Sequence, residues 1–190
     1  MSFVSAVARS NFIVIATDGR ARIDERIVDE NAVKIQMINP FLYIAYTGVK
    51  EACEEIINES RDFISKTNNL TVIGDFIYKK ANSQRYSEIG LSFIIAGKNA
   101  QNKYQLSLVN NKKTKKHKIV RSLFEVHTAF SGGDQLETEK FQRDKELFLK
   151  RIKAASTPQD IQKAQVWLNN QVASIDDSVN TKVKFYAMPL

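Results

Sequence analysis

The change of hydrophobic period along the chain constrains its fold more than any other feature. In residues 1–48 the apolar residues run together or alternate, as in β-strands. The predicted strands span residues 3–8, 12–17, 33–38 and 41–47. Polar residues 18–31 separate the two pairs, and Asn39-Pro40 marks a turn within the second pair. The chain therefore begins with two predicted antiparallel hairpins.

After Gly48 the apolar residues recur at helical spacing. The first predicted helix, residues 49–64, turns one face inward: Val49, Ala52, Cys53, Ile56, Ile57, Phe63 and Ile64. The other predicted helices are residues 71–81, 134–153 and 158–173, with Thr71 and Thr157 as N-caps of the second and fourth. Further strands are predicted at residues 91–96, 104–109 and 182–188, with a weak run over 117–130.

The order of elements is strands, two helices, strands, two helices and a final strand. Because helices are grouped and do not alternate with single strands, the order favours an α+β fold with antiparallel sheets. Two stacked sheets with a helix pair on each outer face would satisfy it. We find no repeat or linker and predict a single domain over residues 1–190.

Composition narrows the class of protein. The chain has 190 residues, 43% of them hydrophobic and 26% charged, with 7 Gly and 3 Pro, which excludes collagen-like and disordered polymers. Its apolar runs, such as residues 12–16, are far shorter than the roughly 20 residues of a membrane span. Cys53 is the single cysteine, and the chain has two histidines, His117 and His127. These three side chains are too few for a typical zinc motif of Cys and His ligands. We expect a cytoplasmic protein with no membrane contact, metal or cofactor.

The net charge of +7 is concentrated locally. Residues 112–118 contain five lysines, which is five of the seven surplus charges. The stretch lacks interleaved aromatic residues for stacking on a single-stranded nucleic acid. We interpret it as a solvated hairpin tip, with a site for an anionic partner as the alternative, and do not expect nucleic-acid binding.

A possible catalytic group lies at the start of the chain. Ser2 follows the initiator methionine and is small enough to become the N-terminus once Met1 is removed. A free α-amine, with a pKa of about 8, can act as base toward the hydroxyl of the same residue. Asp18 ends the second predicted strand and Lys34 begins the third, so the carboxylate could hold the lysine cation near Ser2 and lower the pKa of the amine. Each residue also has an ordinary interpretation without catalysis. Ser2 would simply be the second residue of the chain, Asp18 would belong to a turn, and Lys34 would be a surface lysine.

These residues belong to a longer pattern. It comprises Ser2, Ile15-Ala16-Thr17-Asp18, Ala32-Val33-Lys34-Ile35, Ile38-Asn39-Pro40, Thr47-Gly48 and Ala52-Cys53. The segment resembles the start of a proteasome β subunit or of the related bacterial ring protease HslV, with separations that match without a gap. Ser131-Gly132-Gly133 and Asp176 extend the resemblance more weakly toward the C-terminus.

The resemblance implies a four-layer α-β-β-α sandwich and a set of roles. Ser2 would supply both the nucleophile and the base, and Lys34 would tune the reactivity of Ser2. Asp18 would orient Lys34, and the Gly48 amide would donate to the oxyanion hole. Ser131 and Asp176 would support the amine and relay a proton. By position, the residues that would line the specificity pocket are Ala21, Ala32, Gln36, Tyr46 and Lys50.

The implied function is an N-terminal-nucleophile amide hydrolase, a self-compartmentalising peptidase that acts on a peptide or amide substrate. Its partners would be further copies of itself in a ring and, as a candidate, an ATPase unfoldase. The alternative is a non-catalytic scaffold or binding protein that retains Met1. Two departures from the family pattern stand out: Ser2 replaces threonine, and Arg22 replaces a small hydroxyl residue that pairs with substrate backbone.

Specificity has two interpretations. Arg22 and Lys50 at the rim, with Tyr46 as a wall, would favour a carboxylate next to the scissile amide. Alternatively, Lys50 faces solvent and pairs with Glu54 one helical turn away.

Overall fold

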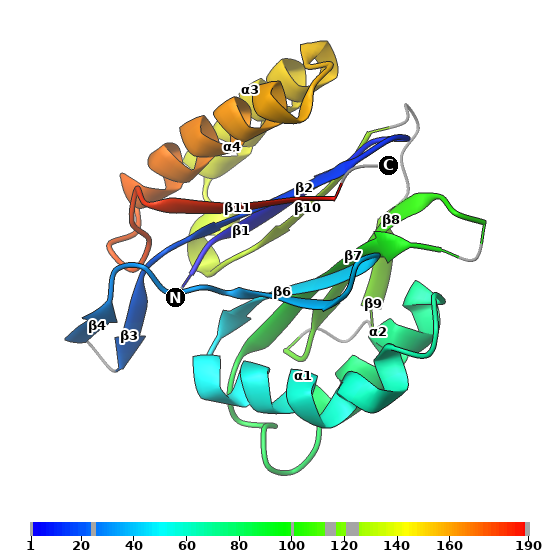
Figure 1. The fold of residues 1–190 in the computed structure, drawn as a ribbon. Helices are drawn as coiled ribbons and strands as arrows, with labels where there is room; N and C mark the ends of the chain where they lie inside the picture. The colour runs from blue at the N-terminus through cyan, green and yellow to red at the C-terminus, as the bar shows by residue number, and fades with distance from the viewer. Residues whose placement is uncertain (1, 24–25, 100, 113–116, 121–125, 189–190) are drawn as a thin grey trace.

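The computed structural model describes residues 2–23, 26–99, 101–112, 117–120 and 126–188. Two antiparallel sheets lie face to face, with α1 and α2 covering one outer face and α3 and α4 covering the other (Figure 1). The predicted four-layer α+β sandwich is confirmed. Among the described residues no helix is long and apolar enough to cross a membrane.

The first sheet combines segments from both ends of the chain, whereas the second is formed by consecutive strands between residues 35 and 120. The first has the order β10-β1-β2-β11, and the second has the order β5-β6-β7-β8-β9. The strands of the first sheet are β1 (Val4–Ala8), β2 (Ile13–Asp18), β10 (His127–Ser131) and β11 (Val183–Met188). Those of the second are β5 (Ile35–Asn39), β6 (Leu42–Gly48), β7 (Leu91–Lys98), β8 (Tyr104–Asn110) and β9 (His117–Val120). The two predicted N-terminal hairpins thus contribute to different sheets.

A third hairpin was not predicted from the sequence. Within the polar residues 18–31 the chain forms β3 (Ala21–Ile23) and β4 (Arg26–Asp29), which pair with each other and stand apart from the main sheets (Figure 1). All four residues of β4 are exposed, so no buried face imposes an alternating pattern on the sequence.

The helices begin and end close to the predicted positions, with two corrections. They are α1 (Lys50–Ile64), α2 (Leu70–Ala81), α3 (Glu139–Ala154) and α4 (Pro158–Ala173). Asn69, and not Thr71, caps α2, because its side-chain oxygen accepts from the amides of Thr71 and Val72. Residues Asp134–Glu137 form a separate 3-10 turn before α3. The predicted cap of α4 is present: Thr157 Oγ1 accepts from Asp160 N at 3.2 Å.

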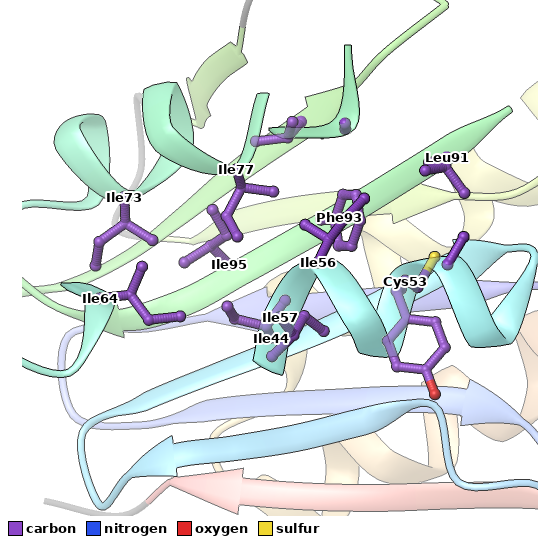
Figure 2. Packing of buried hydrophobic residues seen from close by; sticks show 14 of the residues in the cluster. Ile44, Cys53, Ile56, Ile57, Ile64, Ile73, Ile77, Leu91, Phe93 and Ile95 are labelled. Carbon is purple, nitrogen blue, oxygen red and sulfur yellow. The ribbon is translucent and has the colours of Figure 1, made fainter. Parts of the chain in front are cut away.

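Three apolar clusters hold the layers together: one between the sheets, one under α1 and α2, and one under α3 and α4. Figure 2 shows the second, where isoleucines of α1 and α2 and the buried thiol Cys53 meet Phe93 and Ile95. Val49 and Phe63, predicted to face inward, are 46% and 43% exposed. Val49 precedes the helix, and Phe63 stacks on Phe76 with ring centroids 4.3 Å apart.

The structure describes the two ends of the basic stretch 112–118. Lys112 is exposed in the turn after β8, and β9 begins at residue 117. Residues 113–116, the middle of the predicted hairpin tip, lie outside the described residues.

Candidate active site

The pairing of β1 with β2 brings Ser2 beside Asp18. In the β1–β2 pairing Val4 lies opposite Thr17. Two hydrogen bonds extend this pairing by one residue: Asp18 N donates to Phe3 O at 3.1 Å, and Phe3 N donates to the side-chain Oδ1 of Asp18 at 2.9 Å. Ser2 is therefore buried at the end of the sheet, next to a fully buried carboxylate.

Lys34 provides the counter-charge to Asp18. Its Nζ lies 2.8 Å from Asp18 Oδ1 and also donates to Arg20 O. The contact that the sequence predicts is thus present, in a place where the lysine is only 4% exposed. Burial lowers the pKa of Lys34 below its ordinary value, because the loss of hydration destabilises the ammonium more than the attraction of Asp18 stabilises it. The Asp18 carboxylate also accepts from Arg20 N at 2.9 Å, so it has partners beyond the lysine.

Gly48 ends β6 in a conformation that suits glycine alone. Its φ is +119°, and a Cβ there would lie 2.4 Å from Gly90 O. This turn carries the chain from the second sheet into α1. The preceding residue, Thr47, joins the sheets: its Oγ1 lies 2.7 Å from Ser131 Oγ, and Ser131 pairs with Val4 of β1.

These elements enclose a small pocket of about 60 Å³. Its described lining consists of Ser2, Ala21, Arg22, Lys34, Tyr46, Gly48 and Lys50. All seven are among the residues predicted from sequence, and Asp18 lies directly behind Lys34. Tyr46 donates from its hydroxyl to Glu54 Oε1 at 2.7 Å, and burial raises the pKa of this phenol, so the wall is neutral.

Five predicted residues are not part of the described lining: Asp18, which lies behind Lys34, and four others. Ser131 contacts Thr47 behind it, and Ala32 N donates to Gly19 O at 2.8 Å. Gln36 accepts from Arg61 of α1 at 2.9 Å, and Asp176 Oδ1 accepts from Ser178 N at 2.8 Å in the loop after α4. Their roles stay predictions.

A network of hydrogen bonds and one ion pair behind the site was not predicted from the sequence. The Glu30 carboxylate lies 3.0 Å from Arg20 Nη2 and accepts from Asn180 Nδ2, while Asn180 Oδ1 accepts from Gly19 N at 2.9 Å. Asn169 Nδ2 of α4 donates to Asn180 O at 2.7 Å. The network fixes the turn whose backbone holds both Asp18 and Lys34. Glu30 and Asn180 are 150 residues apart, and no local pattern signals that they meet.

No group of three or more His, Cys, Asp or Glu side chains placed to hold a metal ion occurs among the described residues. The chemistry that the site offers is a hydroxyl beside a buried lysine–carboxylate pair and a glycine amide.

Fold and site together define the class of protein. The family model described as proteasome subunit matches residues 3–112, more than half of the chain. The chain belongs to the proteasome subunit family.

Solved structures agree on the fold. Eukaryotic HslV from Trypanosoma brucei is 13% identical, with a TM-score of 0.72 and 99% of each chain covered. Anbu, the ancestral β-subunit from Yersinia bercovieri, is 12% identical, with a TM-score of 0.73 and coverage of 98% of this chain and 81% of that one. At such identities the likeness is one of fold, and it matches the fold predicted from sequence. A comparison with curated proteins gives no match.

Proposed function

We propose that this chain is an N-terminal-nucleophile amide hydrolase, a proteasome-like peptidase that uses Ser2 once Met1 is removed. One observation carries the proposal. Ser2, a buried lysine paired with a buried carboxylate, and a glycine amide border the same pocket.

The chemistry needs no histidine. In the proposed reaction Ser2 Oγ attacks the substrate carbonyl carbon while its proton passes to the α-amine of the same residue. The Gly48 amide donates to the oxyanion, and the Lys34 ammonium, held by Asp18, favours the unprotonated amine and the developing alkoxide. The amine then protonates the leaving nitrogen, the C–N bond breaks, and an ester on Ser2 remains for water to hydrolyse. Ser131 and Asp176 are proposed to support the amine and relay the proton.

The proposed setting follows the family. Copies of the chain would form a ring that encloses the sites in the cytoplasm, with an ATPase unfoldase as candidate partner. An enclosed chamber would limit cleavage to chains that are fed into it, since a nucleophile open to solvent would cut indiscriminately.

The test begins with maturation. Intact-mass analysis and N-terminal sequencing of protein from its native host should find Ser2 at the N-terminus. The mature protein should hydrolyse fluorogenic peptides, Ser2→Ala should lose that activity while still shedding Met1, and Ser2→Thr should keep it. Retained Met1 together with no cleavage of any peptide would reject the hydrolase and support the scaffold interpretation.

A further inference from the structure

The side-chain amide of Asn180 joins two segments of the chain next to the site. Its Oδ1 accepts from Gly19 N at 2.9 Å, and its Nδ2 donates to Glu30 O at 3.1 Å and to the Glu30 carboxylate. Asn180 is only 6% exposed, so a hydrogen bond lost here is not readily replaced by one to water.

The position of Asn180 is itself fixed from α4. The buried residue Asn169 of this helix donates from Nδ2 to Asn180 O at 2.7 Å. The contact with the turn after β2 is close, since a Cβ on Gly19 would lie 2.8 Å from Glu30 O and 3.1 Å from Lys182 O. Asn180 therefore connects α4 to the turn of residues 18–20.

This turn holds both members of the buried ion pair. Arg20 N donates to Asp18 Oδ2 at 2.9 Å, and Lys34 Nζ donates to Arg20 O as well as to Asp18 Oδ1. Two acceptors of the ammonium thus belong to residues 18–20, and a shift of the turn would move Lys34 Nζ.

We propose that Asn180 is a positioning residue for the reaction, which acts through the turn of residues 18–20 to hold the Lys34 ammonium toward the Ser2 amine. This inference rests on the proposed function and deepens it. Asn180 is not among the described residues that line the pocket, so its loss should affect kcat more than KM.

The pH profile gives a second readout. A displaced Lys34 would no longer lower the pKa of the Ser2 amine, so the acidic limb of kcat/KM should move to higher pH. The other charged side chains described at or behind the pocket are Asp18, Arg22 and Lys50, and the substitution of Asn180 keeps all three.

The experiment uses mature protein that begins at Ser2 and a fluorogenic peptide that the wild type cleaves. Asn180→Ala should lower kcat about tenfold or more, change KM less than about threefold, and raise the acidic limb by roughly half a pH unit. Asn69→Ala is the matched control, because it also removes an amide that accepts from two backbone N–H groups, but at the start of α2. It should leave kcat and the pH profile at their wild-type values.

An exchange of side chains tests the contact with Glu30. Asn180→Asp alone keeps an acceptor for Gly19 N but places a second carboxylate against Glu30, and it should lower kcat about tenfold. Combined with Glu30→Gln, it restores an amide–carboxylate hydrogen bond with donor and acceptor reversed and the net charge unchanged. The double variant should regain at least about threefold in kcat. No gain over Asn180→Asp would refute the contact, and this comparison also serves if Asn180→Ala does not fold.

Wild-type kcat and pH profile in a folded Asn180→Ala protein would overturn the inference and leave the hydrolase standing. If the mature wild type cleaves no peptide, the hydrolase fails, and acetylation of Lys34, followed by mass spectrometry, decides whether Asn180 positions this lysine. Lys34 is 4% exposed in the wild type, so its acetylation should be about tenfold faster in Asn180→Ala than in Asn69→Ala. Equal rates in the two variants would refute the positioning role.

Discussion

At the scale of single residues, the buried pair of Lys34 and Asp18 has the largest expected effect. Lys34→Ala should abolish peptidase activity, because no ammonium then faces the Ser2 amine. It should also lower the free energy of unfolding by about 3–5 kcal/mol, because Asp18 stays buried without its counter-charge. Urea denaturation and peptide hydrolysis measure the two effects.

Lys66→Ala provides the comparison, since an exposed lysine should change stability by no more than about 0.5 kcal/mol. Unchanged hydrolysis by a folded Lys34→Ala protein would remove the mechanism.

At the scale of elements, the junction between β6 and α1 depends on Gly48. Gly48→Ala should destabilise the protein by about 1–3 kcal/mol and reduce activity, since a side chain at φ +119° is strained and its Cβ would lie 2.4 Å from Gly90 O. Thermal unfolding and kcat/KM test this.

The neighbouring Gly90→Ala is the matched variant, because a Cβ there meets its nearest atom, Lys112 Cγ, only at 4.0 Å. We expect it to be close to wild type, and equal losses in the two variants would contradict the assignment of strain to Gly48.

The turn between β2 and β3 depends on Glu30 and should respond to acid. Hydrogen bonds from Asn180 and Arg20 lower the pKa of the Glu30 carboxyl below its ordinary value. In the window between the lowered pKa and the ordinary value of about 4.3, the unfolded chain binds more protons than the folded one. This contribution to stability is therefore present at neutral pH and is lost as the pH falls through the lowered pKa.

Between pH 6 and pH 3.5 the wild type should lose more stability than Glu30→Gln does, as measured by urea midpoints. Glu88→Gln, at an exposed position, should follow the wild type. Parallel curves for wild type and Glu30→Gln would show that Glu30 contributes nothing to the acid response.

At the scale of the whole molecule, we predict a homo-oligomer. The hairpin of β3 and β4 stands away from the body and exposes Ile27 at 50% and Val28 at 55% (Figure 1). Adjacent apolar side chains on a projecting hairpin are suited to burial against another copy. Sedimentation at micromolar concentration should therefore show species larger than the 21.6 kDa chain.

Ile27→Asp should shift that distribution toward the monomer without unfolding the chain, because Ile27 is outside the three apolar clusters. A single 21.6 kDa species in the wild type would contradict the prediction.

The order of the main elements, the grouping of helices into pairs and the proximity of Asp18 and Lys34 could be predicted from the sequence by itself. Strand and helix periods are local properties that a buried face imposes on neighbouring residues. The spacing of Ser2, Asp18 and Lys34 is also read directly along the chain, and strand pairing then brings them together.

Only the tertiary structure decided what depends on distant partners. The bridge from Glu30 to Asn180 leaves no periodic trace, since a hydrogen bond across 150 residues constrains a position and not a pattern. The exposed hairpin leaves none either, because no buried face imposes an alternating pattern on it.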